Sequence, residues 1–449
     1  MESTTICSPW RELQSCRSLY PPDSVEFCPI APYQDVFLVG TYHLTQSQDG
    51  DSAPKTGLDK RKGAIDMYHL NRTEERIELM RSFDTAAILD IKWNHCKVQD
   101  KILFAVVNAI GQLIVYELFC KSADNLLDLD IIKLTSHQLD QGEASEVLGL
   151  SLDWSSRNHT SDGNSRSGVP DDVRSQTKGH LVVSDSRGFV HLFELAEGGL
   201  ILESSWKGHG FEAWIAAFNY AEPTTFYSGG DDCLMKVYDS RQSRPMRIVK
   251  EHDAGVTSIQ YNTFTTALHT LATGSYDEHV YIWDDRNFKS YGTKVHLEGG
   301  VWRIKHQSEG SILTATMYNG FHYVDWRVER GDNSRDGNEI RQGEEIGGKR
   351  DEVKTGAANV GDTINNRDSV HASTMKNIEN ALRDSTLNQR SSKIDVKDTP
   401  TNEEDNVKVL HYKGHGSIAY GVDSCYLDQK YIVTCSFYDH LIHLSVLDK

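Results

Sequence analysis

Residues 272–287, ATGSYDEHVYIWDDRN, read as two short β-strands joined by a tight turn. The run from Val280 to Trp283 is rich in β-branched and aromatic side chains, which favour a strand. The turn before it carries Asp277, Glu278 and His279. These three side chains either hold the turn in place or take part in chemistry.

A histidine precedes this strand–turn–strand pattern, and the arrangement recurs along the chain. Such histidines stand before β-rich runs at His209, His252, His296 and His415. The first two intervals are 43 and 44 residues, the period of four-stranded propeller blades. The third interval is 119 residues, and its excess matches residues 331–405, which are polar, charged and almost free of aromatic residues. Such a segment cannot bury enough apolar surface to offset its ordering entropy, so we predict a disordered insertion.

Earlier β-rich runs, among them AILDIKW and VLGLSLDWS, continue the period without the histidine and bring the number of blades to seven. The last blade lacks one strand at the C-terminus, and WRELQSCRSLY near the N-terminus can supply it. This exchange would close the ring and remove the exposed sheet edges of an open array. We therefore predict an all-β fold, a single seven-bladed WD40 β-propeller over residues 10–449.

Three polar stretches interrupt the predicted propeller. Residues 331–405 fall in blade six and residues 156–178 in blade three, and both should emerge opposite the face that carries the histidines and acidic turns. Residues 45–62 form a loop on the same face as those turns. That loop either contacts a partner or is a solvated spacer.

Composition narrows the classes of function. The formal net charge of −18 disfavours nucleic-acid binding and favours a cationic partner. The eight cysteines include no C-x-x-C pair, so neither a disulfide framework nor a zinc module is expected. The sequence carries no secretory signal pattern and no apolar run of membrane-spanning length. We expect a soluble, cytoplasmic protein that does not bind membranes.

Some of the polar residues are expected to brace the blades. In WD-type blades a histidine, a hydroxyl residue, the turn aspartate and an outer aromatic residue form a hydrogen-bonded set, since buried polar groups need partners. Two such sets are predicted: His252, Thr273 or Ser275, Asp277 and Trp283 in blade five, and His209, Asp232 and Tyr238 in blade four.

Other polar residues on the same turns have no bracing role in this scheme. Aligning GSYDEHVYIW with CSFYDHLIHL places Asp439 and His440 opposite Glu278 and His279. These four residues are therefore candidates for a general acid or base. In the alternative reading, Asp439 serves as the acid partner of His415. Asp231, next to a predicted brace, joins the group as a candidate substrate contact.

Aromatic residues recur at one position of the inner strands. Counted from the blade histidines, Trp214, Trp302 and Tyr420 occupy matching places, with Thr257 in blade five. Aromatic side chains at the mouth of the central channel could bind a quaternary ammonium by cation–π attraction. Alternatively, each packs between neighbouring blades.

Several motifs together resemble one family: DSVEFCP, GTYHL, AILDIKW, SGGDDCLMKVYDSR, ATGSYDEHVYIWDDRN, GGVWRIK, SIAYGVD and CSFYDH. They resemble the WD-repeat family of diphthamide biosynthesis, the diphthine methyl ester hydrolases often filed as diphthine methyltransferases. The similarity covers residues 10–330 and 407–449. It implies a substrate on translation elongation factor 2, a modified histidine whose side chain carries a trimethylammonium group and a methyl ester. It also implies release of methanol, with other diphthamide-pathway enzymes as possible partners.

Ester hydrolysis needs a base or nucleophile and donors for the oxyanion. No G-x-S-x-G elbow occurs, and Cys233 and Cys435 have no setting that would lower a thiol pKa. We predict that His440 or His279 acts as base with Asp439 or Glu278, and that Arg303 or the GHGS backbone stabilises the oxyanion. No cofactor or metal is expected.

Two rival functions remain open from the sequence. A non-catalytic WD40 scaffold would recruit other proteins of the pathway, because fold does not imply function. A reader of trimethylated side chains would use Trp214, Trp302 and Tyr420 without hydrolysis. Methanol release by the purified protein separates both from an esterase.

Overall fold

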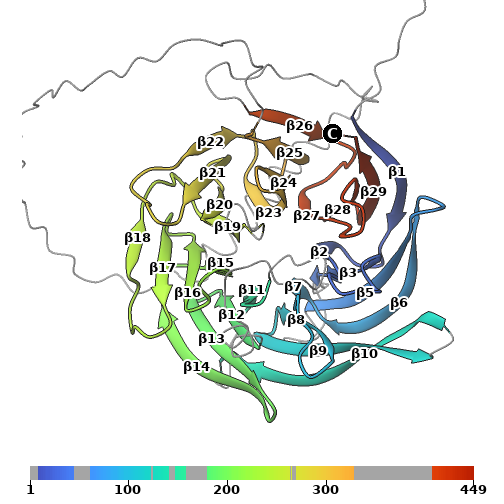
Figure 1. Cartoon of the computed structure of the whole chain (residues 1–449), viewed down its shortest axis with the longest axis horizontal. Helices are drawn as coiled ribbons and strands as arrows, with labels where there is room; N and C mark the ends of the chain where they lie inside the picture. The colour runs from blue at the N-terminus through green and yellow to red at the C-terminus, as the bar shows by residue number, and fades with distance from the viewer. Residues whose placement is uncertain are drawn as a thin grey trace, which may run out of the picture. The chain divides into compact units, whose positions relative to one another are not determined.

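The computed structural model describes residues 9–44, 61–122, 125–140, 147–157, 179–262, 264, 269–327 and 407–448. In these residues every regular element is a β-strand, and the strands form seven sheets arranged as a ring (Figure 1). This confirms the predicted seven-bladed β-propeller. The segment 331–405 and nearly all of 45–62 and 156–178 lie outside the described residues, but Arg61 and Lys62 belong to a strand rather than to the predicted loop.

The first three blades each run from an inner to an outer strand in chain order. Blade one contains β2 (Pro22–Phe27), β3 (Val36–Thr41), β5 (Arg61–Asn71) and β6 (Arg76–Ala86), with the short β4 (His43–Leu44) paired to β5. Blade two contains β7 (Ile88–Trp93), β8 (Ile102–Asn108), β9 (Gln112–Ser122) and β10 (Asn125–Gln138). Blade three contains β11 (Gly149–Trp154), β12 (His180–Asp185), β13 (Phe189–Ala196) and β14 (Gly199–Lys207).

The remaining blades follow the same plan. Blade four contains β15 (Ala213–Phe218), β16 (Thr225–Gly230), β17 (Met235–Asp239) and β18 (Arg247–Val249). Blade five contains β19 (Val256–Tyr261), β20 (Thr270–Ser275), β21 (His279–Asp284) and β22 (Thr293–His296). Blade six contains β23 (Val301–Ser308), β24 (Ser311–Thr316), β25 (Phe321–Asp325) and β26 (Lys408–Tyr412). Blade seven contains β27 (Ala419–Ser424), β28 (Tyr431–Ser436), β29 (Leu441–Leu447) and β1 (Trp10–Arg17).

The N-terminal strand β1 closes the ring, as predicted. It pairs antiparallel with β29, from Trp10 opposite Leu447 to Arg17 opposite Leu441. The Trp10 indole is buried and donates a 2.8 Å hydrogen bond to Ser445 Oγ. Blade seven therefore combines strands from both ends of the sequence. Its pairing closes the ring of blades, as the edges of an open array would otherwise be exposed.

The core lies between adjacent blades, and polar links across the blade interfaces fix the inner strands. Each inner strand contacts the next around the ring, from β2 through β7, β11, β15, β19, β23 and β27 back to β2. Trp93 Nε1 donates to the backbone carbonyl of Glu26, and Trp154 Nε1 makes the same bond to Lys92. Such pairing satisfies the polar end of a large buried ring.

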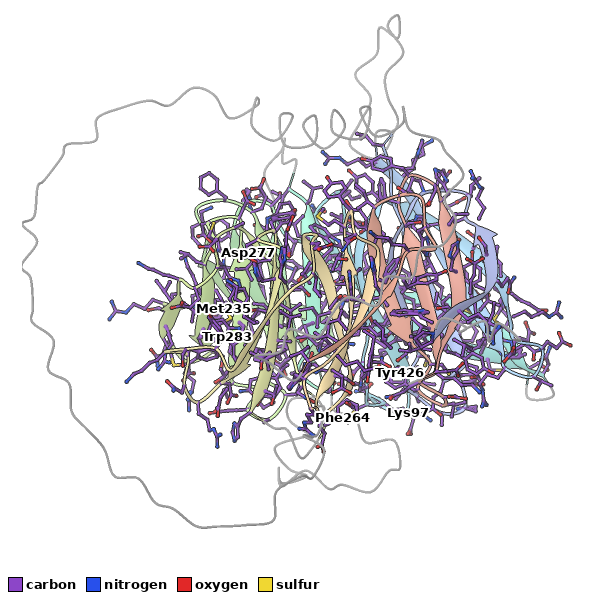
Figure 2. The ribbon with its side chains drawn as sticks, turned by 90° about the horizontal axis from the view of Figure 1, so that it is seen from above. Lys97, Met235, Phe264, Asp277, Trp283 and Tyr426 are labelled. Carbon is purple, nitrogen blue, oxygen red and sulfur yellow. The ribbon has the colours of Figure 1, made fainter. Side chains whose placement is uncertain are left out.

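The two faces of the propeller are distinguished by their connections. We call the face with the turns between second and third strands the turn face, after Asp277 in the β20–β21 turn. Figure 2 places Asp277 near one face and Lys97, Phe264 and Tyr426, which connect first and second strands, near the other. The turn face is where the sequence predicted a site.

Every inner strand carries a β-bulge at its second residue. The register with the second strand shifts by one between its first and third residues, for example between Ala213 and Ile215. A bulge leaves one residue unopposed and re-aims its side chain. We call the seven bulged residues the mouth ring: Asp23, Leu89, Leu150, Trp214, Thr257, Trp302 and Tyr420.

Candidate functional site

The aromatic members of the mouth ring contact one another. The ring centroids of Trp214 and Trp302 lie 5.7 Å apart, and those of Trp302 and Tyr420 lie 5.3 Å apart. Tyr276, from the β20–β21 turn, lies 6.2 Å from Trp214 and 6.1 Å from Trp302. Trp214 belongs to blade four and Trp302 to blade six, so they meet across blade five. These aromatic residues therefore gather at the channel mouth rather than packing separately between blades.

The other side of the mouth is aliphatic. Leu89 and Trp214 pack against one apolar cluster that includes Leu150, and Tyr42 joins them from blade one. Thr257 uses its hydroxyl internally, donating to the backbone carbonyls of Gly274 and Val301. Asp23 is thus the single carboxylic acid of the mouth ring.

Two polar groups border the aromatic cluster. Asp231, an exposed residue of the β16–β17 turn, accepts a 3.1 Å hydrogen bond from Trp214 Nε1. The Trp302 indole N–H is buried and has no acceptor among the described residues. Carboxylate charge beside electron-rich ring faces favours a cation.

Sequence reasoning missed Asp23. It is 6% exposed, and within the described part of the chain no hydrogen bond or ion pair engages its carboxylate. Burial raises its pKa to about 8, because the positive charges of Arg303 and Lys92, partly offset by Asp90, do not replace the lost hydration. In blades four to seven the bulge position of the inner strand can be found by counting from a histidine. Blade one has no such histidine, so the sequence does not show that Asp23 occupies the equivalent position.

A group of charged residues lies next to the mouth ring. Arg303 follows Trp302 in β23 and reaches across the channel to blade two, where its Nη2 donates to the Leu89 carbonyl at 3.0 Å. The same nitrogen lies 3.3 Å from Asp90 Oδ1, which also contacts Lys92 Nζ. Burial raises the pKa of Asp90, but Arg303 and Lys92 outweigh it and hold the pKa below its usual range. Cationic donors therefore lie next to the aromatic cluster.

Further charged residues occupy the channel toward the opposite face. Glu26 accepts from Arg157 Nη2 at 2.5 Å and from Lys305 Nζ. A small cavity there is lined in part by Arg157, Lys305, Asp423 and Tyr426. Burial raises the pKa of Asp423 to about 6, although Lys305 acts against the rise. These residues pair across the blades and hold the channel together.

The braces of blades four and five use the residues named from the sequence. His209 Nδ1 lies 2.7 Å from Asp232 Oδ1, and Ser228 Oγ links His209 Nε2 to the Tyr238 hydroxyl. In blade five Thr273 Oγ1 lies 3.1 Å from His252 Nε2 and accepts from Trp283 Nε1 at 2.9 Å.

The turn aspartate Asp277 faces His252 but makes no hydrogen bond to it, since His252 Nδ1 has no hydrogen-bond partner among the described residues. His252 Nδ1 lies 3.7 Å from Asp277 Oδ2, an ion-pair distance. Burial acts to raise the pKa of Asp277, but His252 and the backbone amides of Asp253 and His279 hold it well below its usual range.

Blade seven corrects the alignment made from the sequence. Asp439 Oδ2 accepts from the Gly416 amide and Oδ1 from the Leu441 amide, the same pattern that Asp277 makes with Asp253 and His279. Asp439 therefore stands in the place of Asp277, because the blade-seven turn contains one residue more. Ser436 Oγ bonds both Asp439 Oδ1 and His415 Nδ1, each at 2.5 Å. This agrees with the alternative in which Asp439 serves His415.

The four candidate acid–base residues occupy two separate turns. His440, with a φ of 61°, takes the left-handed position that Glu278 holds in blade five with a φ of 68°. His279 Nδ1 lies 2.6 Å from its own turn carbonyl at Asp277. None of the described contacts joins Glu278 or His279 to Asp439 or His440, and blade six separates the two turns.

His296 does not brace blade six, contrary to the repeat inferred from the sequence. Its side chain is half exposed, and its Nε2 lies 2.9 Å from Glu278 Oε2. Leu297, five residues before Trp302 and buried, occupies the bracing position instead. In blade six the histidine therefore lies one residue before the bracing position.

The two cysteines near the turns are poor nucleophiles. Burial, followed by the charges of Asp231 and Asp232, raises the pKa of Cys233. Burial also raises the pKa of Cys435. Both thiols favour the protonated form, which does not attack esters readily.

Among the described residues, no three His, Cys, Asp or Glu side chains group so as to hold a metal ion. The same residues include no helix long and apolar enough to span a membrane.

Comparison with known proteins identifies the class first. The family described as "WD domain, G-beta repeat" matches residues 243–284. A chain in the solved mitotic checkpoint complex superimposes with a TM-score of 0.55 at 11% identity, covering 100% of this chain and 95% of that chain. This likeness concerns the fold alone, a WD-repeat propeller.

Closer relatives define the family. Diphthine methyltransferase of Mus musculus is 37% identical over 320 residues, 69% of this chain and 62% of that protein. The diphthine methyltransferase homolog of Dictyostelium discoideum is 30% identical over 337 residues, 68% of this chain and 81% of that protein. The chain belongs to the diphthine methyltransferase family of WD-repeat proteins. The match spans about three fifths of the length of the mouse relative.

Proposed function

We propose that this protein hydrolyses the methyl ester of methylated diphthine on translation elongation factor 2, giving diphthine and methanol as a late step of diphthamide biosynthesis. The family relationship points to diphthine as the modified group. The observation that carries the proposal is the aromatic cluster at the channel mouth, with carboxylates beside it.

The trimethylammonium end of the substrate suits this cluster. The Trp302 ring lies 5.7 Å from Trp214 and 5.3 Å from Tyr420, and Asp231 adds negative charge through its bond to Trp214. A quaternary ammonium has no hydrogen to donate, so ring faces and nearby carboxylates are its natural partners. The net charge of −18 adds a long-range attraction for a cationic group.

The ester end needs hydrogen-bond donors. Arg303, which neighbours Trp302 in β23, is a cationic donor that could stabilise the developing oxyanion. The exposed aromatic residues Phe211, Tyr318 and Tyr438 lie in connections on the turn face. They offer contact area for the body of a protein substrate such as elongation factor 2.

Two other functions use the same surface. A reader of trimethylated side chains would bind at the cluster without turnover, and a scaffold would bind other proteins of the pathway. The unpaired carboxyl of Asp23 favours a ligand-binding or catalytic site over a scaffold, because burying an unpartnered ionisable group costs stability and does not serve protein recruitment. Turnover separates catalysis from reading, since a reader could use the same carboxylate as a counter-ion.

The test is methanol release from methylated elongation factor 2 by the purified protein, followed by the loss of one methyl group in the substrate mass. We expect turnover without added metal or other proteins. Binding of the methylated factor without methanol would support the reader, and absence of both would support the scaffold. Single His440→Ala and His279→Ala variants test the two bases predicted from the sequence. If both variants stay folded and keep full activity, neither histidine is the base.

A further inference from the structure

We propose that Asp23 is the general base of this hydrolysis, taking a proton from the water that attacks the ester carbonyl. This inference rests on the proposed function and adds a reacting group to it. Asp23 lies on β2 in blade one, while the histidine candidates lie in the turns of blades five and seven.

The position of Asp23 is the first argument. It occupies the same bulge as the three aromatic members of the mouth ring. Blades one and seven are neighbours, and Gly421, directly after Tyr420, packs against blade one so closely that a Cβ there would lie 3.0 Å from the Val25 amide. This contact brings the Tyr420 bulge beside the Asp23 bulge. A cation held by the aromatic cluster therefore lies close to the Asp23 carboxyl.

The second argument is that Asp23 is available. The other acids near the mouth have partners: Asp90 contacts Arg303 and Lys92, and Asp231 accepts from Trp214. Asp439 is engaged by two backbone amides and Ser436. Asp23 is 94% buried, yet in the described structure its carboxylate receives no hydrogen bond. An unpaired buried polar group usually serves function or is satisfied by a ligand.

The surroundings of Asp23 control its charge. The charged groups that act on it are Arg303 from β23 and Asp90 and Lys92 from β7. Burial raises the pKa of the Tyr420, Cys435 and Tyr42 side chains, and the charge of nearby Asp23 adds to each rise. These side chains come from blade seven and from the end of β3. Its pKa of about 8 lies near the pH at which a base works best. A trimethylammonium group bound beside it would lower that pKa and so produce the carboxylate when substrate arrives.

The proposed steps conserve atoms and charge. Asp23 carboxylate accepts one proton of water while the water oxygen bonds the ester carbonyl carbon. The carbonyl becomes a tetrahedral oxyanion, which Arg303 stabilises. Collapse breaks the bond to the methoxy oxygen, and protonated Asp23 returns its proton to that oxygen, giving methanol. The product acid loses its own proton to solvent.

The experiment compares the full-length wild type with Asp23→Asn, an isosteric side chain that cannot accept the proton. Asp100→Asn, an exposed acid on the opposite face, is the matched control. With methylated elongation factor 2 as substrate, we expect Asp23→Asn to lower kcat at least 100-fold, within the usual range for a general base, with KM changed less than about tenfold. Wild-type kcat/KM should rise with pH, reach half its limiting value near pH 8 and level off at higher pH, and this rise should be absent in Asp23→Asn. Added formate should restore part of the kcat of Asp23→Gly.

Other outcomes would contradict the role of Asp23 as base. Wild-type kcat in Asp23→Asn with a raised KM would make Asp23 a counter-ion for the cation and overturn its role as base. A lower kcat with an unchanged pH profile and no rescue of Asp23→Gly would reduce it to a structural residue. A wild-type protein that releases no methanol would overturn the proposed function and the inference together, whereas an active wild type with an equally active Asp23→Asn overturns the inference alone.

Discussion

Replacing Asp23 with Asn should stabilise the protein, and by an amount that depends on pH. Burial raises the pKa of Asp23 from 3.8 to about 8, so between these values the folded state holds a proton that the unfolded state releases. Stability that is present at acidic pH is therefore lost as the pH rises toward 8. Each pKa unit corresponds to about 1.4 kcal/mol, so wild type should lose about 4 kcal/mol between pH 5 and pH 8 through this group. Asn does not titrate and should lose none.

The measurement is urea unfolding of wild type, Asp23→Asn and Asp100→Asn at several pH values from 5 to 9. The difference in unfolding free energy between Asp23→Asn and wild type should grow steadily toward pH 8 and then level off. The Asp100→Asn control should follow wild type throughout, because its side chain is exposed. Parallel curves for Asp23→Asn and wild type, or a variant less stable than wild type at pH 8, would refute the assignment of a buried, unpaired carboxyl. The result does not depend on the identity of the substrate.

Three further predictions follow from the contacts. Trp302→Ala should weaken binding of tetramethylammonium by about 2- to 30-fold in calorimetric titration, the range of one cation–π contact, and unchanged affinity would remove this ring from the site. Trp10→Ala should lower the unfolding free energy by about 3–5 kcal/mol in urea, since this buried ring holds β1 in blade seven; a loss under about 1 kcal/mol would mean that the strand closes the propeller by backbone pairing alone. Ser436→Ala should cost about 1–3 kcal/mol by separating His415 from Asp439, and a neutral thermal shift would contradict the blade-seven brace.

The fold was predictable because its signals are local. Period, turn chemistry and alternation lie within single blades, and even the closing strand followed from counting the strands of blade seven. The prediction that His296 braces blade six was wrong because the histidine lies one residue away from the bracing position. His296 is on the surface, and Leu297 occupies the buried position. Blade seven was misaligned for the same reason, since a one-residue insertion in its turn moved Asp439 into the bracing role. Spacing alone cannot detect such shifts, because hydrogen bonds decide which residue occupies a position.

The site was only half predictable. Trp214 and Tyr420 could be matched because blades four and seven carry a histidine five residues ahead of them, and Trp302 because His296 lies only one residue off that spacing. Their convergence depends on side chains from non-adjacent blades meeting across the channel, which no local pattern contains. Asp23 lay within a motif that supported the family resemblance, yet its environment comes from β7, β23 and β27. A buried carboxyl without a partner is a property of the assembled ring.

The bulge explains how the mouth can hold unusual residues without disturbing the blades. Two positions after each bulge, all seven inner strands place a buried aliphatic side chain: Val25, Ile91, Leu152, Ala216, Ile259, Ile304 and Val422. At the bulge itself the same strands place an acid, two leucines, a threonine and three aromatic residues. A position that belonged to the packed core would be apolar in every blade, because interiors tolerate little change in shape or polarity. The bulged residue is unopposed in the ladder, so its side chain is free of that constraint. Uniform chemistry at one position and diverse chemistry two residues away, on seven copies of the same strand, indicates that packing of the blades does not dictate which residues form the mouth ring.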